Sequence, residues 1–361
     1  MDKIDYTFVH NEFQINDFPI NYDRLLTLAG TYVKDGDPYM QSIGNFLFDW
    51  LDERDYIEAT TSGSTGLPKV IRLKKQHMVN SALATGNYLE LSPGNTALLC
   101  LPADFIAGKM MLIRAIVLGL HLEIIPPSSM PLALTNSDFD FAAMIPLQAS
   151  KSYYDLGRIR KLILGGASID DDLEEKLQSV STKIYASYGM TETISHIAMR
   201  KVNHSATHEK SYKALPGVTF SQDENHCLII DAPAIADHQI VTNDVVNLIS
   251  ATEFEWLGRH DNVINSGGFK VFPESVERKL GKHLKHQYFI THEADEELGN
   301  KAVLYVEADE TDYPNLLNIL HKDKEMLRYE IPRTVYFVPK FVFTDSHKIK
   351  RKATVKQYTK S

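Results

Sequence analysis

The chain has 361 residues, 43% of them hydrophobic and 24% charged, and a formal net charge of -9. This length allows two domains with separate cores, and the negative charge disfavours a surface that coats nucleic acid. Two cysteines, Cys100 and Cys227, are too few for a disulfide scaffold or a zinc site and fit a reducing cytoplasm. Polar residues break the most apolar stretch, 110–127, and no signal peptide is visible, so we expect a soluble cytoplasmic protein without a membrane span.

The N-terminal part predicts mainly helices. Residues 1–21 lack a clear period and are typical of an extended arm at a domain edge, whereas 22–33 favours a helix. Between 39 and 51 apolar residues recur at three- and four-residue steps, which indicates one buried helical stripe. Apolar runs at 56–59 and 69–73 then predict two strands joined by a loop.

From residue 75 onward helices and strands alternate. Helices are expected at 75–89, 106–120, 148–156 and 170–179, and short apolar strands at 97–101, 122–125, 139–145, 161–164 and 183–186. This alternation predicts an α/β fold with helices on both faces of a largely parallel sheet. Functional groups in such sheets gather at the carboxyl ends of the strands.

The pattern changes after about residue 196. Short β-like runs separated by turn residues predict a small, mostly antiparallel β subdomain, and 258–262 is typical of a linker. An α+β set follows, with helices expected at 274–286 and 313–327 and strands at 288–291, 302–306 and 335–338. We therefore predict a large N-terminal domain over 1–260 and a small C-terminal α+β domain over 261–361.

The loop between the strands at 56–59 and 69–73 is rich in glycine and hydroxyl groups. Glycine permits φ > 0, so such a loop can turn several N–H groups toward one anion, and its lysine would add positive charge for phosphate. A P-loop is disfavoured because Pro68 precedes the lysine and Val70 follows it. Alone, the loop fits a surface hairpin as well as a phosphate site. Its residues are Thr60, Thr61, Ser62, Gly63, Ser64, Thr65, Gly66, Leu67, Pro68 and Lys69.

Further clusters lie downstream. Leu-Gly-Gly-Ala-Ser begins at Leu164, and Ser-Tyr-Gly-Met-Thr-Glu-Thr begins at Ser187, each where an expected strand ends. Thr-Asn-Asp at 242–244, Gly-Arg-His-Asp at 258–261 and Ser-Gly-Gly at 266–268 come later, followed by a basic C-terminal tail. Taken singly, each is more typical of an ordinary turn or of surface charge than of a site.

Taken in order, these clusters resemble the signatures of the adenylate-forming superfamily, which includes acyl-CoA synthetases, non-ribosomal peptide synthetase adenylation domains and luciferases. The resemblance runs from Thr60 to Arg351, although the N-terminal region before the loop is shorter than the family usually has, which would narrow the acyl pocket. It implies the acyl-CoA synthetase fold and the use of ATP with Mg²⁺. The ATP-binding residues that it implies are Thr61, Ser62, Gly63, Ser64, Thr65, Gly66, Lys69, Gly166, Ala167, Tyr188, Gly189, Asp244 and Arg259.

The resemblance also implies individual roles in the nucleotide site. Tyr188 would stack on adenine, Thr191 would bond the α-phosphate, and Glu192 would hold Mg²⁺. Magnesium on nucleotide phosphates takes one or two carboxylates plus water, which agrees with a single glutamate. Asp244 would accept hydrogen bonds from both ribose hydroxyls. The preceding Asn243 replaces the family's glycine, and because asparagine tolerates left-handed conformations we expect a turn there.

The C-terminal clusters imply the moving parts of the enzyme. Asp261 would mark the hinge between the domains, and Gly267 and Gly268 would line the tunnel for coenzyme A. Lys348 corresponds to the family's adenylation lysine, although His347 stands where glycine is usual. A mobile ammonium suits a bridge between the attacking carboxylate and the α-phosphate oxygens.

The expected helix at 106–120 indicates which carboxylic acid the enzyme would use as its substrate. Its entry, Leu-Pro-Ala-Asp-Phe-Ile-Ala-Gly, and an arginine six residues after that glycine resemble the o-succinylbenzoate–CoA ligases of menaquinone synthesis, with Phe105 in place of their histidine. A buried cation needs an anionic partner, so Arg114, Lys109 or both would bind the benzoate carboxylate of a dicarboxylic acid or pair with an internal Asp or Glu. The acyl-substrate residues expected are Phe105, Gly108, Lys109, Arg114 and Gly165.

We therefore expect an AMP-forming acid–CoA ligase that uses ATP, Mg²⁺ and coenzyme A, with o-succinylbenzoate as the favoured acid. Three alternatives stay open: a ligase for another aromatic acid of the phenylacetate–CoA ligase type, a carrier-loading adenylation enzyme, and a nucleotide-binding module without catalysis. Neither nucleic acid nor a membrane is an expected partner. The oligomeric state, a homodimer included, is left open.

Overall fold

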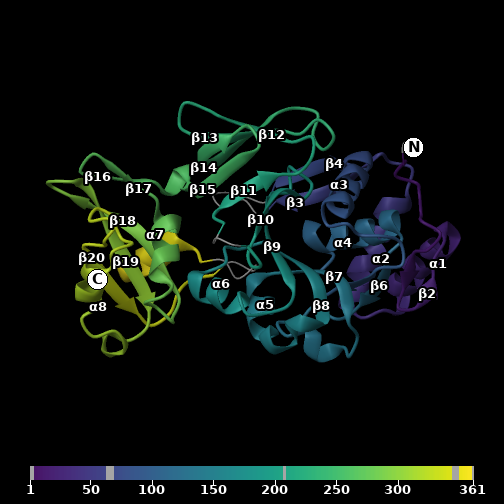
Figure 1. Cartoon of the computed structure of the whole chain (residues 1–361), viewed down its shortest axis with the longest axis horizontal. Helices are drawn as coiled ribbons and strands as arrows, with labels where there is room; N and C mark the ends of the chain where they lie inside the picture. Colours follow the sequence, from purple (N-terminus) through teal and green to yellow (C-terminus); the bar gives the residue numbers. More distant parts are fainter. Residues whose placement is uncertain (1–3, 62–68, 206–208, 344–348, 360–361) are drawn as a thin grey trace.

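The computed structural model describes residues 4–61, 69–205, 209–343 and 349–359, and these form three sheets (Figure 1). A 13-stranded mixed sheet spans most of the chain, a two-stranded hairpin flanks it, and five C-terminal strands form a sheet of their own. The hairpin consists of β3 (Tyr56–Thr61) and β4 (Lys69–Lys74). Within the described part of the chain, no helix is long and apolar enough to span a membrane.

Six neighbouring strands of the large sheet are parallel, in the order β9-β8-β7-β5-β6-β1. Successive residues of these strands face opposite cores: Ala97 and Leu99 lie in one, Leu98 in the other. The strands are β5 (Thr96–Leu99), β6 (His121–Ile124), β7 (Phe139–Met144), β8 (Ile159–Leu164) and β9 (Lys183–Gly189), with β1 (Gln14–Ile15) and β2 (Phe18–Pro19) at the edge. The predicted α/β fold is therefore confirmed.

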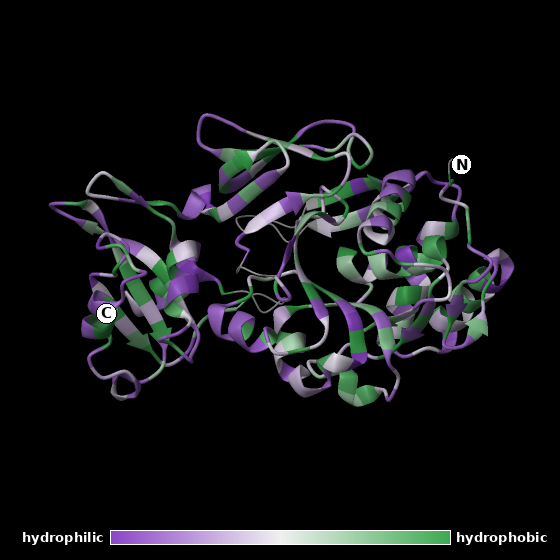
Figure 2. Ribbon diagram, in the orientation of Figure 1, coloured by the Kyte–Doolittle hydropathy of each residue, from purple (hydrophilic) through white to green (hydrophobic). Residues whose placement is uncertain are grey.

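Helices cover both faces of this parallel part. One core contains side chains of α1 to α4, and the other contains side chains of α5 and α6. Helix α4 is apolar on almost every side and is buried. Figure 2 gives the hydropathy of each residue along the ribbon. It ends at Gly119, whose φ of 71° is the left-handed conformation that favours glycine. The helices are α1 (Tyr22–Asp35), α2 (Pro38–Leu51), α3 (Lys75–Tyr88), α4 (Ile106–Leu118), α5 (Pro146–Lys151) and α6 (Asp171–Leu177).

The strands of the small, mostly antiparallel β part predicted after residue 196 extend the same large sheet. They follow β9 in the order β10-β11-β15-β14-β13-β12. The turn predicted at Asn243 is wrong, because β14 runs through that residue, and the predicted linker begins later, because Gly258 and Arg259 end β15. The strands are β10 (His196–Lys201), β11 (Ser211–Ala214), β12 (Thr219–Gln222), β13 (Cys227–Asp231), β14 (Ile240–Ser250) and β15 (Glu253–Arg259).

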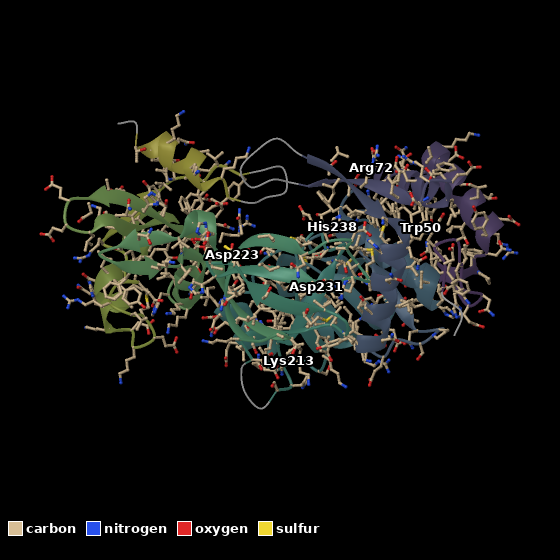
Figure 3. All side chains as sticks on the ribbon, turned by 90° about the horizontal axis from the view of Figure 1, so that it is seen from above. Trp50, Arg72, Lys213, Asp223, Asp231 and His238 are labelled. Atoms are coloured by element: carbon tan, nitrogen blue, oxygen red, sulfur yellow. The ribbon has the colours of Figure 1, made fainter. Side chains whose placement is uncertain are left out.

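The C-terminal sheet has a core on each face. One contains side chains of α7 and α8, and the other packs against α9. Seen from above (Figure 3), this sheet lies at one end of the molecule and the helices around Trp50 at the other. Its elements are β16 (Ile264–Ser266), β17 (Phe269–Val271), α7 (Pro273–Leu280), β18 (Tyr288–Asp295), β19 (Gly299–Glu307), α8 (Leu316–Lys322), β20 (Thr334–Val338) and α9 (Arg351–Tyr358).

Candidate active site

The carboxyl ends of β8 and β9 lie side by side, which brings two of the predicted clusters together. Leu164 pairs with Ala186 in the parallel register, so the loops that follow start next to each other. The Ser187 hydroxyl donates to the Leu164 carbonyl oxygen at 3.0 Å. Gly165 fits against that hydroxyl, because a Cβ added there would lie 2.6 Å from Ser187 Oγ. Gly166 follows with a φ of 82°, which a side chain would strain.

Replacing Gly165 by alanine should lower the free energy of unfolding by about 1–3 kcal/mol, because the new methyl group overlaps the Ser187 hydroxyl. Ser187→Ala alone removes one hydrogen bond, worth about 1 kcal/mol. The double variant should be more stable than the sum of the two losses predicts, since the smaller residue frees the space. Urea unfolding of the four proteins measures this, and strictly additive losses would contradict the close approach.

Beyond β9 the chain makes a tight turn that presents Thr191 and Glu192. A Cβ added to Gly189 would lie 2.2 Å from the Ser195 carbonyl oxygen, so only glycine fits. Ile194 has a φ of 65°, an outlier for a β-branched residue and a sign of local strain. The turn is closed by Thr193, whose buried hydroxyl bonds the Met190 and Ser195 backbone. Backbone strain at a strand end is typical of functional turns.

Glu192 is exposed at this turn, which suits the Mg²⁺ ligand expected there. No group of three or more His, Cys, Asp or Glu side chains among the described residues could hold a metal by itself. Magnesium that arrives with a nucleotide does not need such a cage, because phosphates and water supply most of its ligands. The residues present therefore fit Mg²⁺ bound with ATP, and the role of Glu192 remains a prediction.

A partly buried tyrosine and a buried aspartate connect β9 to the middle of β14 and the end of β15. The Tyr188 hydroxyl donates to Asp244 Oδ2 at 2.6 Å, and Arg259 Nε lies 3.7 Å from Asp244 Oδ1. Asp244 and Arg259 are also paired in the β14–β15 register. Burial, and then the charge of Asp244, raises the pKa of Tyr188 well above its usual value, so the phenol stays a neutral donor. The predicted adenine and ribose residues thus meet in one place.

The predicted hinge residue joins the same set. Asn243 Nδ2 donates to Asp261 Oδ2 at 3.2 Å, and Arg259 Nη2 lies 4.0 Å from the same oxygen. The asparagine that replaces the family's glycine therefore supplies a side-chain contact where a turn was expected. At the tip of the β16–β17 hairpin, Gly267 and Gly268 have φ values of 56° and 85°, which a two-residue turn of this kind requires.

Arg114 is buried in the middle of α4 without an acidic partner among the described residues. Its guanidinium donates to Thr85 Oγ1 at 3.3 Å and to Ser195 Oγ at 3.0 Å, and Nη1 lies 3.8 Å from Met111 Sδ. The side chain is 3% exposed. Burial lowers the pKa of Arg114 to about 10, and no carboxylate counteracts that effect. The internal ion pair that was one of two expectations for this residue is therefore not formed within the described chain.

The hydroxyls around Arg114 belong to a polar cluster that no local sequence pattern indicated. Thr85 Oγ1 donates to the Ser81 carbonyl, so it accepts from Arg114 and from Nε2 of His196, 3.1 Å away. Ser81 Oγ lies 3.0 Å from Ser195 Oγ. Burial, and then the charge of Arg114, lowers the pKa of His196 well below its usual value, so the imidazole is neutral. We call Ser81, Thr85, Arg114, Ser195 and His196 the Arg114 cluster.

The other residues expected near the acid lie at the start of α4. Gly108 packs on the chain before the helix, because an added Cβ would lie 2.2 Å from the Pro102 carbonyl oxygen, and Phe105 is 55% exposed. Lys109 Nζ lies 5.5 Å from the centre of the Phe46 ring, and burial lowers its pKa. Lys109 and Arg114 therefore contact different neighbours, and only Arg114 lies in the cluster beside the turn after β9.

Several predicted site residues lie outside the described residues: Ser62, Gly63, Ser64, Thr65, Gly66 and Lys348. Their roles remain predictions. The strands on either side of the glycine-rich loop are described, and the last pair of the β3–β4 ladder is Thr61 with Lys69. Gly166 and Ala167 are exposed at the carboxyl end of β8, as the nucleotide role requires.

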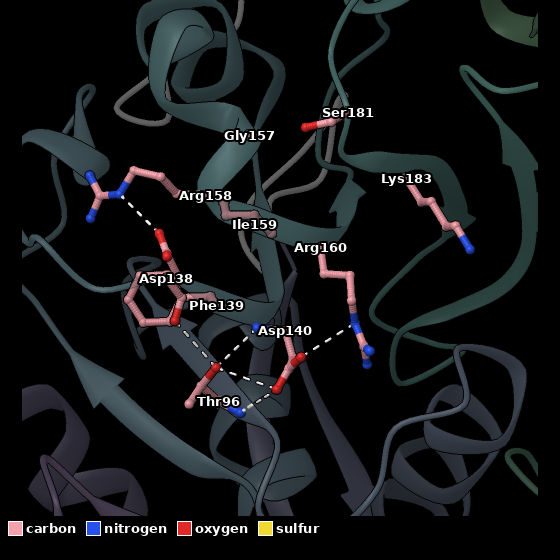
Figure 4. Close-up of a pocket in the computed structure, with 10 residues that line it drawn as sticks. All are labelled: Thr96, Asp138, Phe139, Asp140, Gly157, Arg158, Ile159, Arg160, Ser181 and Lys183. Carbon is pink, nitrogen blue, oxygen red and sulfur yellow. Dashed lines mark hydrogen bonds and ion pairs between the residues drawn. The ribbon is translucent and has the colours of Figure 1, made fainter.

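A cavity with charged walls lies away from the predicted site residues. A cavity of 410 Å³ opens at the amino ends of β7, β8 and β9, at the opposite edge of the sheet from the predicted residues (Figure 4). Both arginines of this cavity have acidic partners: Arg158 Nε lies 3.7 Å from Asp138 Oδ1, and Arg160 Nε lies 3.3 Å from Asp140 Oδ1. Ligands of open α/β sheets bind at the carboxyl ends of the strands, so we place the active site there and not in this cavity.

Known proteins are similar to this chain in sequence and architecture. The family model described as "AMP-binding enzyme" matches residues 56–233. The 2-succinylbenzoate–CoA ligase of Escherichia coli strain K12 is 26% identical over 354 residues, covering 91% of this chain and 76% of that protein. The o-succinylbenzoate CoA synthetase of Bacillus subtilis, solved with the acyl-adenylate intermediate, is 19% identical and has the same fold, with a TM-score of 0.72 over 84% of this chain and 68% of that one.

A further solved structure is closer in sequence and extent. The acyl-CoA synthetase (AMP-forming)/AMP-acid ligase II-like protein of Dyadobacter fermentans DSM 18053 is 34% identical. The match covers 92% of this chain and 97% of that one, with a TM-score of 0.60. The likeness extends well beyond the residues that the family model matches, and it includes the C-terminal sheet. This chain therefore belongs to the AMP-binding enzyme family, among the AMP-forming acyl-CoA synthetases.

Proposed function

We propose that this enzyme ligates o-succinylbenzoate to coenzyme A in two steps. In the first step, a carboxylate oxygen attacks the α-phosphorus of ATP and the bond from that phosphorus to the oxygen of the β-phosphate breaks. Pyrophosphate departs and an acyl-adenylate is formed. In the second, the coenzyme A thiol attacks the acyl carbon and AMP leaves. No protein nucleophile is needed, so positioning and charge stabilisation supply most of the acceleration.

The choice of acid rests on one observation, the buried guanidinium of Arg114 without a carboxylate partner among the described residues. A buried charge is costly unless it is paired, and Arg holds a carboxylate through two parallel hydrogen bonds. The acid named in the relatives has two carboxylates. The ring carboxylate would pair with Arg114, and the succinyl carboxylate would remain free to react.

The position of the Arg114 cluster supports this orientation. Ser195, which accepts from Arg114, lies only three residues after Glu192 in the turn that follows β9. An acid bound at Arg114 would therefore extend toward the same turn that carries the predicted Mg²⁺ and α-phosphate residues. Gly165 would leave room for its acyl chain beside that turn.

The nucleotide would lie along the set formed by Tyr188, Asp244 and Arg259. The neutral phenol holds one oxygen of Asp244, and the side chain of Arg259, close to the other oxygen, is 38% exposed. Magnesium, when bound with ATP, would neutralise charge on the phosphates near Glu192. Lys348 would stabilise the charge that moves from the carboxylate to the α-phosphate.

The C-terminal residues 261–361 would act as a mobile domain. Rotation about Asp261 would withdraw Lys348 after adenylation and bring the Gly267–Gly268 hairpin to the coenzyme A path. We place the enzyme in the cytoplasm and leave a homodimer as one arrangement of the chain. These assignments are proposals drawn from the resemblance and from the separate C-terminal sheet.

A panel of acids tests the proposal. Pyrophosphate release should be fastest with o-succinylbenzoate and slower with 4-oxo-4-phenylbutanoate, which lacks only the ring carboxylate. Phenylacetate and benzoate represent the other aromatic-acid ligases. Formation of the thioester with free coenzyme A distinguishes a ligase from a carrier-loading enzyme, and absence of pyrophosphate release with every acid would identify a nucleotide-binding module.

A further inference from the structure

The start of α9 is tied to the C-terminal sheet by charged groups that are largely removed from solvent. Arg351 donates from Nη2 to Glu277 Oε2 at 2.8 Å and from Nη1 to the Ile290 carbonyl oxygen at 3.2 Å. Arg351 Nη2 also lies 3.8 Å from Glu274 Oε1. The three charged side chains are at most 24% exposed, so this is a partly buried ion cluster and not a surface pair.

The carboxylate of Glu277 has a second anchor. Its Oε1 accepts from the Ile290 backbone N–H at 2.7 Å, in strand β18. Burial raises the pKa of Glu277 to about 7, while the charge of Arg351 and the Ile290 hydrogen bond act in the opposite direction. Each member of the pair therefore depends on the other, and the guanidinium is fixed in both position and orientation.

Glu274 extends the cluster toward the proposed hinge. Its Oε2 accepts from the Arg259 backbone N–H at 3.4 Å, and its Oε1 accepts from the Asn262 side-chain amide. A Cβ added to Gly258 would lie 2.5 Å from Glu274 Oε2, so the carboxylate is closely packed there. The first turn of α7 thus joins the end of β15 to Arg351.

The same region holds the two ends of the segment 344–348. Phe343 pairs with Ile349 in an antiparallel bridge, and the Lys350 N–H donates to the Val342 carbonyl oxygen at 2.7 Å. The Val342 N–H in turn donates to the buried Thr354 hydroxyl at 3.0 Å. The residue directly after Lys348 is therefore fixed next to Arg351.

We propose that Arg351 is a positioning residue for adenylation, because its contacts with Glu277 and Glu274 fix the point of the chain from which Lys348 reaches the α-phosphate. The inference rests on the proposed function, since it requires Lys348 to act in the first step. In the second step Lys348 is withdrawn. Loss of Arg351 should therefore slow one half-reaction and spare the other.

The test compares the two half-reactions in Arg351→Ala. Pyrophosphate release from ATP and acid, without coenzyme A, should fall on the order of 10-fold through kcat, because a small displacement of a catalytic group has a large effect on rate. Thioester formation from added acyl-adenylate and coenzyme A should change less than about twofold. Arg351→Lys should recover part of the rate, since it keeps the charge but loses the two-point contact.

A matched control separates positioning from simple loss of stability. Lys279 and Glu330 form a comparable ion pair between α7 and the chain before β20, with oxygens 2.6 and 2.7 Å from Nζ. Lys279→Met should leave both half-reactions unchanged. Equal losses in both half-reactions of Arg351→Ala, or an unchanged rate of adenylation, would overturn the inference.

Amide hydrogen exchange provides a readout that does not need activity. In Arg351→Ala the Lys350 amide should exchange faster, while amides of β18 and β19 keep their protection. If the wild-type enzyme adenylates no acid while this exchange result is obtained, the proposed function fails and the anchoring contact stands. If the exchange of Lys350 is unaltered, the anchoring itself is wrong.

Discussion

Arg114→Ala is expected to lower kcat/KM for o-succinylbenzoate about 100-fold. A buried, charge-assisted pair between guanidinium and carboxylate contributes about 3 kcal/mol to the discrimination, because either charge is costly when it is left alone. In the wild-type enzyme 4-oxo-4-phenylbutanoate should be the poorer substrate by a similar factor. In Arg114→Ala the two acids should react at similar rates, since the group that distinguishes them is gone.

This comparison of two acids with two proteins isolates the contact from any general damage to the site. Lys109→Ala is the matched control, because Lys109 is a half-buried cation of the same helix that contacts Phe46 instead of the cluster. It should keep the preference for o-succinylbenzoate. If Arg114→Ala retains the full preference between the two acids, the proposed role of Arg114 is wrong.

Without substrate, the buried charge of Arg114 should make the wild-type protein less stable than a variant with an apolar side chain at this position. A pKa lowered to about 10 corresponds to a penalty of about 3 kcal/mol on the charged form, which is the form present at pH 7. The penalty is the same throughout the range below pH 10, because the unfolded side chain is also charged there. Arg114→Met should therefore raise the free energy of unfolding by about 1–3 kcal/mol, while affinity for the acid falls. A destabilised methionine variant would show that the hydroxyl contacts outweigh the desolvation.

Asp244→Ala is expected to raise KM for ATP about 100-fold. The alanine would remove the acceptor proposed for the two ribose hydroxyls, and it leaves the partly buried Tyr188 hydroxyl without its partner. A hydrogen bond to a charged group contributes about 1.5–3 kcal/mol. Wild-type enzyme should strongly prefer ATP to 2′,3′-dideoxy-ATP. The variant should use both nucleotides about equally.

Tyr188→Phe serves as the comparison for Asp244→Ala. It keeps the ring, with its contacts to Phe254 and Tyr212, and removes only the 2.6 Å hydrogen bond to Asp244. Its KM for ATP should rise less than about 10-fold, and the preference for the ribose hydroxyls should remain. Loss of that preference in Tyr188→Phe, or its retention in Asp244→Ala, would contradict the assignment of Asp244 to the ribose.

Sequence patterns were sufficient for the parallel part of the fold because its strands are short apolar runs between helices. The side-by-side ends at Leu164 and Ala186 follow directly from that order. The sequence does not predict β14 as one element, since Asn243 is typical of turns, yet this strand of eleven residues runs through Asn243. Here the tertiary contact with Asp261 outweighs the local preference.

The Arg114 cluster shows why part of the site could not be predicted. Ser81 and Thr85 are ordinary hydroxyls of a helix, and Ser195 and His196 are more than 100 residues away in sequence. Only the folded chain brings these groups around the guanidinium. One signal was available, the spacing of Ser81 and Thr85 by one helical turn on a buried face, but that spacing equally fits ordinary packing.

The most direct test of the proposed reaction follows an oxygen atom from the acid into AMP. o-Succinylbenzoate labelled with ¹⁸O in its succinyl carboxylate is converted with ATP and coenzyme A, and the AMP is analysed by mass spectrometry. Attack of that carboxylate on the α-phosphorus predicts AMP with one ¹⁸O and the release of pyrophosphate. Unlabelled AMP, which attack by the unlabelled ring carboxylate would give, or ADP as the product would contradict it.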